Sequence, residues 1–255
     1  MRSLFKFFLN LFPRPWLIKL SYWVRPMIAF FLRGNRFVDP IDEKSYRKFL
    51  PYGYERVREN VLAPGTLSLE RHRLFWLYLK NETNFFKQEG LRVLHFAPEQ
   101  AFLKRFRKCK NIEYTTTDLE SPIADVKADI CNLPFEDNSY DFIICNHVLE
   151  HIPDDTKAMQ ELFRVLAPGG TAIVQVPYDR KRSTTFEDDT ITDPKERARI
   201  FGQYDHVRVY GMDYFDKLAN VGFKVEAVDY TTTLSEVDIE KYRLPKGELV
   251  PVCKT

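Results

Sequence analysis

The side chains best suited to chemistry fall in two short segments, residues 146–151 and 201–211. The first segment reads NHVLEH and the second reads FGQYDHVRVYG. A neutral imidazole can take a proton from an acceptor group, so His147 and His206 are candidate general bases. His151 begins the turn into the next predicted helix, and we interpret it as a structural residue.

Three neighbours of His206 complete the candidate catalytic set. Asp205 or Tyr210 would orient the imidazole, and Arg208 would bind a carboxylate or phosphate of the substrate. The alternative is a salt-bridge network that only holds a loop together. We favour the functional interpretation, because dense polar side chains in a long loop are typical of binding segments.

Two carboxylates that follow predicted strands are suited to binding a nucleoside. Asp118, with Leu119 after it, ends the second strand, where a carboxylate can accept hydrogen bonds from both ribose hydroxyls. Asp129 and Ile130 end the third strand, where they could bind an exocyclic amine and pack against a flat base. Each aspartate alone could instead be a turn or capping residue. Their joint placement favours an adenosine site.

Strands that alternate with helices must position these residues. The predicted strands are short apolar or β-branched runs at Leu91–Phe96, Ile112–Thr117, Asp125–Ile130, Tyr140–Asn146 and Thr171–Pro177. Helices are predicted over Glu99–Lys108 and Asp154–Leu166, and Pro168-Gly169-Gly170 should stop the second one. This alternation predicts a doubly wound parallel sheet, which binds ligands at the carboxyl ends of its strands.

The pattern is less regular after the fifth strand. Residues 178–210 lack clear periodicity, so we expect a lid or binding loop there. A helix is predicted over Met212–Asn220, followed by strands near Phe223–Tyr230 and Glu248–Cys253. With no helix expected between them, the last two strands should pair antiparallel at one edge of the sheet.

Residues 91–177 resemble class I S-adenosylmethionine-dependent methyltransferases of the type 11 group, above all in the run ADICNLPFEDNSYDFIICNHVLEHIPDD. The resemblance implies a Rossmann-like α/β sheet of seven strands whose last strand is antiparallel. It also implies an enzyme that transfers a methyl group, with S-adenosylmethionine as its cofactor. The residues that would line this cofactor are His95, Phe96, Ala97, Glu99, Asp118, Leu119, Asp129, Ile130, Asn146 and His147.

One departure from the family concerns the loop after the first strand. The family places E/D-x-G-x-G-x-G there, whereas this chain has His95 to Ala101 with no glycine. Ala97 is small enough to take the place of the first glycine, and we expect Glu99 to meet the cofactor's ammonium group. A subgroup with a similar H-x-A-P-E loop carries cysteines before SLERHR, where this chain has residues 63–66, APGT, so no metal site is expected. The alternative function is a binding or scaffold protein that kept the fold but lost the cofactor.

Composition excludes several other classes. The four cysteines form no C-x-x-C pair, which argues against a disulfide framework and a cysteine zinc site. The absence of G-x-G-x-x-G argues against a nicotinamide-dependent dehydrogenase. Residues 39–255 carry 31 basic and 36 acidic side chains, and no N/D-P-P-Y/F follows the fourth strand, so a nucleic-acid substrate is disfavoured.

The first 38 residues differ from the rest because they carry seven basic side chains and no acid. We divide the chain into this basic, aromatic, helical extension (1–38), an irregular segment with a helical lead-in from Ser68 (39–90), and the methyltransferase domain (91–255). Residues 1–33 could lie in a membrane interface, or could pack as an arm on the body or on a second subunit. We expect a cytoplasmic enzyme, at the inner face of a membrane if residues 1–33 bind one, that acts on a small-molecule or glycan or lipid-linked acceptor.

Overall fold

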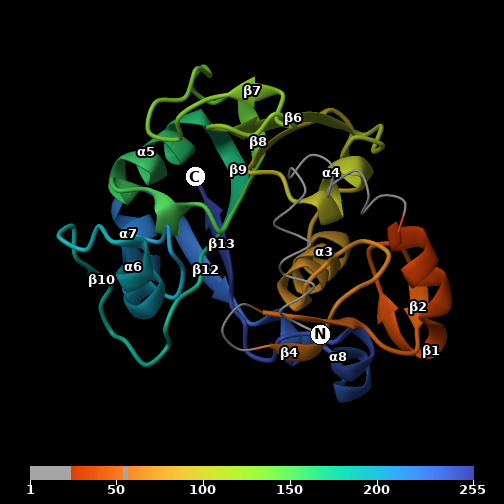
Figure 1. Cartoon of the computed structure of the whole chain (residues 1–255). Helices are drawn as coiled ribbons and strands as arrows, with labels where there is room; N and C mark the ends of the chain where they lie inside the picture. Colours follow the sequence, from red (N-terminus) through yellow and green to blue (C-terminus); the bar gives the residue numbers. More distant parts are fainter. Residues whose placement is uncertain (1–23, 54–56) are drawn as a thin grey trace. The chain divides into compact units, whose positions relative to one another are not determined.

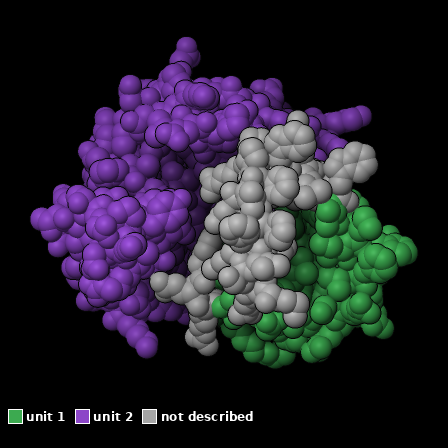
Figure 2. All heavy atoms as spheres, in the orientation of Figure 1, with its two compact units in different colours: residues 1–78, 231–246 green, residues 79–230, 247–255 purple. Residues whose placement is uncertain are grey.

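The computed structural model describes residues 24–53 and 57–255 (Figure 1). It divides into two compact units, shown in different colours in Figure 2. Unit 1 comprises Met1–Tyr78 and Thr231–Lys246, and unit 2 comprises Leu79–Tyr230 and Gly247–Thr255. Every candidate site residue named above belongs to unit 2. Within the described residues, no helix combines the length and the apolar character needed to cross a bilayer.

Unit 2 is built on one seven-stranded sheet with the order β12-β13-β9-β8-β5-β6-β7. Its strands are β5 (Leu91–Phe96), β6 (Ile112–Asp118), β7 (Val126–Lys127), β8 (Tyr140–Asn146), β9 (Leu166–Gln175), β12 (Lys224–Val228) and β13 (Val250–Lys254). Strands β5 to β9 pair in parallel, and β13 is antiparallel to both β9 and β12. The predicted doubly wound sheet with an antiparallel last strand is therefore confirmed.

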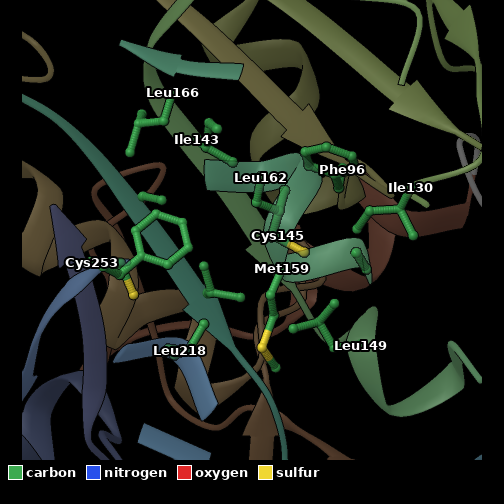
Figure 3. Close-up of a cluster of buried hydrophobic side chains, with 14 of the residues drawn as sticks. Phe96, Ile130, Ile143, Cys145, Leu149, Met159, Leu162, Leu166, Leu218 and Cys253 are labelled. Carbon is green, nitrogen blue, oxygen red and sulfur yellow. The ribbon is translucent and has the colours of Figure 1, made fainter. Parts of the chain in front are cut away.

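The central strands are buried on both faces, which explains their continuous apolar sequences. Alternate residues of β8 face the helices α5 (Asp155–Val165) and α7 (Tyr214–Asn220), where Ile143 and Cys145 join a large apolar cluster (Figure 3). From α5, Met159 and Leu162 complete this cluster, and both are almost fully buried. The cluster fixes α5 on the sheet and so fixes the chain between β8 and α5.

The opposite face of the sheet packs against α4 (Gln100–Phe106). Phe102 and Phe106 of this helix stack with ring centroids 5.4 Å apart. Phe85 lies 5.0 Å from Phe106 and 5.1 Å from Phe142 of β8, measured between ring centroids. Because α4 begins directly after β5, this aromatic packing holds the loop between them in place.

Two boundaries near α5 differ from the sequence prediction. The helix starts as expected, with Asp154 accepting a hydrogen bond from the Lys157 N–H at 2.9 Å. It ends at Val165, and the glycine pair 169–170 lies inside β9 instead of stopping the helix. Ala167 precedes a proline, which disfavours helical backbone and favours the extended conformation that starts β9 early.

The segment 178–210, expected to be an irregular loop, contains regular elements. They are β10 (Phe186–Glu187), α6 (Pro194–Phe201) and β11 (Arg208–Val209), with β10 and β11 paired antiparallel. The expectation failed because α6 is short and polar. Its end signals were nevertheless present, since Asp193 caps the helix, Pro194 opens it and Gly202 closes it with φ 87°.

Two further elements correct the prediction. The connection between β12 and β13, expected to lack a helix, contains α8 (Glu236–Tyr242), whose first turn is capped by Ser235. The third strand of the parallel series is only β7, because Asp125 instead accepts hydrogen bonds from the N–H and hydroxyl of Thr116. Residues 129 and 130 therefore lie in a turn after a two-residue strand.

Unit 1 contains strands where irregular structure was expected. Two antiparallel pairs form, β1 (Arg33–Asp39) with β2 (Lys44–Tyr46) and β3 (Leu50–Tyr52) with β4 (Arg58–Leu62). The unit also includes α3 (Glu70–Glu82) as far as Tyr78. All of α8 belongs to it as well. Its apolar centre comprises Leu32, Phe37, Tyr46, Phe49 and Ala63.

Arg73 is the charged centre of unit 1 and is fully buried. Its guanidinium donates to the carbonyl oxygens of Val61, Ser68, Tyr242 and Arg243 at 2.6–3.1 Å. Burial lowers the pKa of Arg73 to about 10. One side chain thus joins α3 to the segment that carries α8, which explains why the charge-rich SLERHR segment is largely structural.

The expected helical extension is described only in part. Residues 24–31 are helical, whereas residues 1–23 lie outside the described residues. Within the helical part, the side chains of Met27, Phe30 and Phe31 are 61%, 60% and 66% exposed.

We predict that Leu162→Ala lowers the free energy of unfolding by about 2–5 kcal/mol, because it removes a fully buried side chain from the cluster under the sheet. Denaturant unfolding followed by circular dichroism measures this. The matched control is Gln160→Ala, an exposed position on the same helix, which should change stability by less than about 0.5 kcal/mol. Equal effects of the two substitutions would contradict the assigned face of α5.

Candidate active site

A half-buried carboxylate at the carboxyl end of β5 organises the candidate site. The Oε2 atom of Glu99 lies 2.6 Å from His95 Nε2, and its Oε1 atom accepts a hydrogen bond from Asn146 Nδ2 at 3.1 Å. Because a carboxylate accepts, His95 carries its proton on Nε2, and its Nδ1 faces the Tyr114 hydroxyl at 2.7 Å. Glu99 is therefore held by groups from the ends of β5 and β8.

His95 and Phe96 do not offer their side chains to a ligand, contrary to the sequence prediction. The side chain of His95 is fully buried, and both of its ring nitrogens face protein groups. Phe96 is 3% exposed and packs in the apolar cluster on the other face of the sheet. Successive residues of a strand point to opposite faces, so both are core residues, and His95 acts by positioning Glu99.

Ala97 takes the backbone conformation that the missing glycine would favour. Its φ is 44°, in the left-handed region, and its N–H donates to the Thr117 carbonyl at 2.9 Å. This conformation costs an L-residue about 1–2 kcal/mol, and alanine has the smallest side chain that must bear it. The loop thus turns at Ala97 as a glycine-containing loop would.

Two buried polar atoms at the ends of the strands on either side of β5 have no hydrogen-bond partner among residues 24–53 and 57–255. They are Thr117 Oγ1 on β6 and Asn146 Oδ1 on β8. An unpaired buried polar group costs about 1–3 kcal/mol, which a ligand that hydrogen bonds to it would recover. Asn146 Oδ1 is next to the amide nitrogen that holds Glu99, so an ammonium group has both an amide oxygen and a carboxylate to meet. Sequence reasoning missed Thr117, which looks like any other strand residue.

The two carboxylate oxygens of Asp118 differ in their hydrogen bonds. Its Oδ1 accepts from the N–H groups of Glu120 and Ser121 at 2.9 and 2.7 Å. Across the described part of the chain, no hydrogen bond engages Oδ2. The turn role weighed from the sequence is thus real for one oxygen, and the second oxygen stays available. Leu119, the next residue, is 63% exposed.

Asp129 and Ile130, which were predicted to bind the adenine base, both have local contacts within the protein. Asp129 is exposed, and its Oδ1 accepts from the Cys131 N–H at 2.8 Å, as in a turn. Ile130 is 5% exposed and belongs to the apolar cluster. The structure therefore assigns Asp129 a local turn role and Ile130 a core role at this edge of the sheet.

The turn after β8 holds two side chains against each other. His147 has φ 55°, and its N–H donates to the Gln175 carbonyl at 2.7 Å. Its Nδ1 lies 3.2 Å from Glu150 Oε1, and Glu150 is only 1% exposed. Because a carboxylate oxygen only accepts, the Nδ1 atom of His147 is the one that carries a proton toward Glu150.

The segment 201–211 brings a second histidine to this turn. The rings of His151 and His206 meet edge to face with centroids 4.7 Å apart. His206 Nδ1 donates to the Phe201 carbonyl at 3.1 Å, which leaves Nε2 with its lone pair. Burial lowers the pKa of His206, so its neutral form is favoured. Sequence reasoning assigned His151 a structural role and therefore missed this pairing.

Asp205 does not orient His206 as predicted. Its Oδ1 accepts from Gln203 Nε2 at 2.8 Å, and its Oδ2 lies 3.5 Å from His151 Nδ1. The same nitrogen of His151 lies 3.3 Å from the Asp205 carbonyl. Asp205 thus faces His151, and the Phe201 carbonyl orients His206.

Arg208 and Tyr210 are structural, which corrects their predicted catalytic roles. Arg208 is 4% exposed and donates to the carbonyls of Leu149, Ile152 and Pro153 and to Glu187. Tyr210 is fully buried and donates to Asp155 Oδ2 at 2.8 Å. Burial, helped by Asp155, raises the pKa of Tyr210. Both side chains are buried and bonded to protein groups, and together they tie residues 208–210 to the turn after β8.

The comparisons with known proteins agree with this architecture. A family model described as a methyltransferase domain matches residues 80–174. A demethylmenaquinone methyltransferase from Staphylococcus epidermidis is 43% identical over 58 residues, which are 23% of this chain and 24% of that protein. A 2-phytyl-1,4-naphtoquinone methyltransferase from Nostoc punctiforme is 44% identical over 52 residues, 20% of this chain and 23% of that protein. The match thus spans about a quarter of the length of each relative.

Solved structures give a more distant likeness. An S-adenosylmethionine dependent methyltransferase from Mesorhizobium loti has 16% sequence identity and a TM-score of 0.48, over 71% of this chain and 98% of that one. The match over residues 80–174 makes this part of unit 2 similar to methyltransferase domains, and the sheet has the seven strands with an antiparallel last strand that the sequence resemblance implies.

We predict that Ala97→Gly leaves the free energy of unfolding unchanged or raises it by up to about 1 kcal/mol, because it relieves the left-handed backbone. The matched control is Ala101→Gly inside α4, which should lower stability by about 1 kcal/mol or more. Thermal and denaturant unfolding measure both. A loss at position 97 as large as the loss at position 101 would show that the loop does not turn as described.

Proposed function

We propose that the protein is an S-adenosylmethionine-dependent methyltransferase that acts on a small-molecule or glycan or lipid-linked acceptor. The observation that carries the proposal is the Glu99 carboxylate, held by His95 and Asn146 at the carboxyl edge of a methyltransferase sheet. A carboxylate at this place can accept hydrogen bonds from the ammonium group at the cofactor's methionine end.

The residues at the sheet edge fit this cofactor. Glu99 and the unpaired Asn146 Oδ1 would hold the ammonium group, and Asp118 Oδ2 would accept from a ribose hydroxyl. The exposed Leu119 would cover one face of the adenine ring, with Asp129 beside its exocyclic amine. When bound, the cofactor supplies a methyl group on a positively charged sulfur, which is already activated for displacement.

The chain's own contribution is then to position the acceptor and to accept its proton. His147 and His206 each hold the Nδ1 proton against a protein oxygen, so Nε2 of either ring can take a proton from a hydroxyl. His147 follows β8 directly and is therefore the residue we assign as base, next to Asn146 at the proposed cofactor site. Alignment of the acceptor with the methyl group and exclusion of water would supply the rest of the rate enhancement.

The proposed acceptor follows from the names of two relatives and from the charge of the chain. The two curated relatives are named for quinone substrates, but each match covers only about a quarter of the relative. We therefore propose a small or lipid-linked acceptor and no nucleic acid, in keeping with the acidic body of the chain. The scaffold alternative predicts that the protein does not bind the cofactor, which the next experiment measures.

We predict that Asp118→Asn weakens the binding of S-adenosylhomocysteine about tenfold or more, measured by isothermal titration calorimetry. Asparagine keeps an oxygen for the N–H groups of Glu120 and Ser121, so the turn is preserved, but it loses the charged acceptor at Oδ2. The control is Glu120→Gln, an exposed neighbour, which should leave the affinity unchanged.

The outcomes of this titration separate the two functions. Saturable binding to the unmodified protein, weakened only at position 118, supports the ribose assignment. Unchanged affinity in Asp118→Asn would refute that assignment. No binding to the unmodified protein would favour the scaffold function.

We also propose that residues 1–33 contact a membrane surface, which would place the enzyme at the cytoplasmic face of a membrane. The described part of this segment supports the proposal, because Phe30 and Phe31 are exposed next to Arg33. Exposed aromatic side chains beside basic ones are suited to an interface with anionic headgroups.

We predict that the full chain floats with vesicles that contain anionic lipid and that the double substitution Phe30→Ser and Phe31→Ser reduces the floated fraction several-fold. Each aromatic side chain removed takes away apolar area that the interface would bury. The control is Val237→Ser, which also removes an exposed apolar side chain but lies on α8. Equal flotation of all three proteins, or none, would contradict the proposal.

A further inference from the structure

Three side chains from two segments that are distant in sequence converge at the turn after β8. One carboxylate oxygen of Glu150 and one ring nitrogen from each of His151 and His206 lie within 4.8 Å of one another. Glu150 and His151 come from the short helix η1 (Leu149–His151), and His206 comes from the segment after α6. The Glu150 carbonyl accepts from the Val207 N–H at 3.0 Å, which holds the two segments together.

The local hydrogen bonds leave suitable donor atoms for a metal ion. His206 donates from Nδ1 to the Phe201 carbonyl, and the Nδ1 atom of His151 faces the Asp205 carbonyl. A ring nitrogen that holds its proton against an oxygen leaves the other nitrogen as a neutral, oriented ligand. Both imidazoles are therefore arranged as histidines commonly are in metal sites.

A second, independent observation concerns the carboxylate. Glu150 is 1% exposed, and its Oε1 atom lies 3.2 Å from His147 Nδ1. Its Oε2 atom is buried and has no hydrogen-bond partner within residues 24–53 and 57–255. An unpaired carboxylate oxygen in the interior is costly unless a cation neutralises it.

We propose that Glu150, His151 and His206 bind one divalent transition-metal ion. Two imidazole nitrogens and one carboxylate oxygen form a mixed donor set that suits ions such as Zn²⁺, Fe²⁺ or Co²⁺ better than Mg²⁺ or Ca²⁺. Ligands about 2.1 Å from one ion lie at most about 4.2 Å apart, so small side-chain rotations close the present arrangement around an ion. Three protein ligands leave at least one position of the ion open.

The open position gives the ion a role that rests on the proposed function. An oxygen of the methyl acceptor bound there would lose its proton more readily, because the ion stabilises the oxyanion. His206 would then be a metal ligand, and His147, which binds the other oxygen of Glu150, would accept the proton. This account restricts the acceptor to molecules with a hydroxyl or enol oxygen.

Titration of the chelator-treated full chain with Co²⁺ tests the site, because ligand-field absorption reports the ion's ligands. We expect saturable uptake of one ion, displaced by Zn²⁺, and about 100-fold weaker binding in Glu150→Gln and in His206→Asn. The control is Glu136→Gln, an exposed carboxylate outside the cluster, which should bind as the unmodified protein does. Circular dichroism of each metal-free variant verifies that it is folded.

The results that would overturn the proposal are specific. Absence of saturable Co²⁺ and Zn²⁺ binding by the unmodified protein would refute it without any variant. Equal loss in Glu136→Gln and Glu150→Gln would show that the ion binds elsewhere. Titration of the same samples with S-adenosylhomocysteine keeps the two proposals separate, since ion uptake without cofactor binding refutes the methyltransferase function and leaves the metal site standing.

Discussion

The carboxylate of Glu99, fixed between His95 Nε2 and Asn146 Nδ2, is the interaction on which the architecture of the site depends. It joins the ends of the two central strands and sets the entry into α4, with the left-handed turn at Ala97 between them. The methyltransferase family that the sequence resembles places an acid at the end of the first strand and glycines after it. Here His95, the last but one residue of β5, stands near that place, and the acid comes four residues later at the start of the helix. Different residues thus supply the charge and the turn.

The turn after β8 connects this carboxylate to the second cluster of polar groups. Asn146 holds Glu99, and the next residue, His147, holds Glu150. The buried pair Arg208 and Tyr210 fastens the later segment to the same turn. Their charge and polarity, which suggested catalysis, are used to satisfy carbonyl groups inside the protein. The groups available for chemistry are the atoms that no protein hydrogen bond uses, such as Asn146 Oδ1 and the Nε2 atom of His206.

The sequence predicted the bounds of strands well where burial restricts which residue types can occur. Strands β5 and β8 have the predicted bounds, because only buried central strands need uninterrupted apolar runs. Helix α6 escaped prediction because it is short and polar, and its capping residues were the only signal. The site was predicted as positions along a sheet edge, but sequence spacing could not distinguish Arg208, which is buried, from His206, which keeps a ring nitrogen available. For Arg208, that distinction depends on tertiary contacts between residues 56 and 59 positions apart.

A crystal structure of the protein with S-adenosylhomocysteine tests the central claim most directly. The account predicts density for the ligand across the carboxyl ends of β5, β6 and β8, with its ammonium group within hydrogen-bond distance of Glu99 and its ribose at Asp118. Density at another place, or a ligand whose ammonium group is turned away from Glu99, would contradict the account.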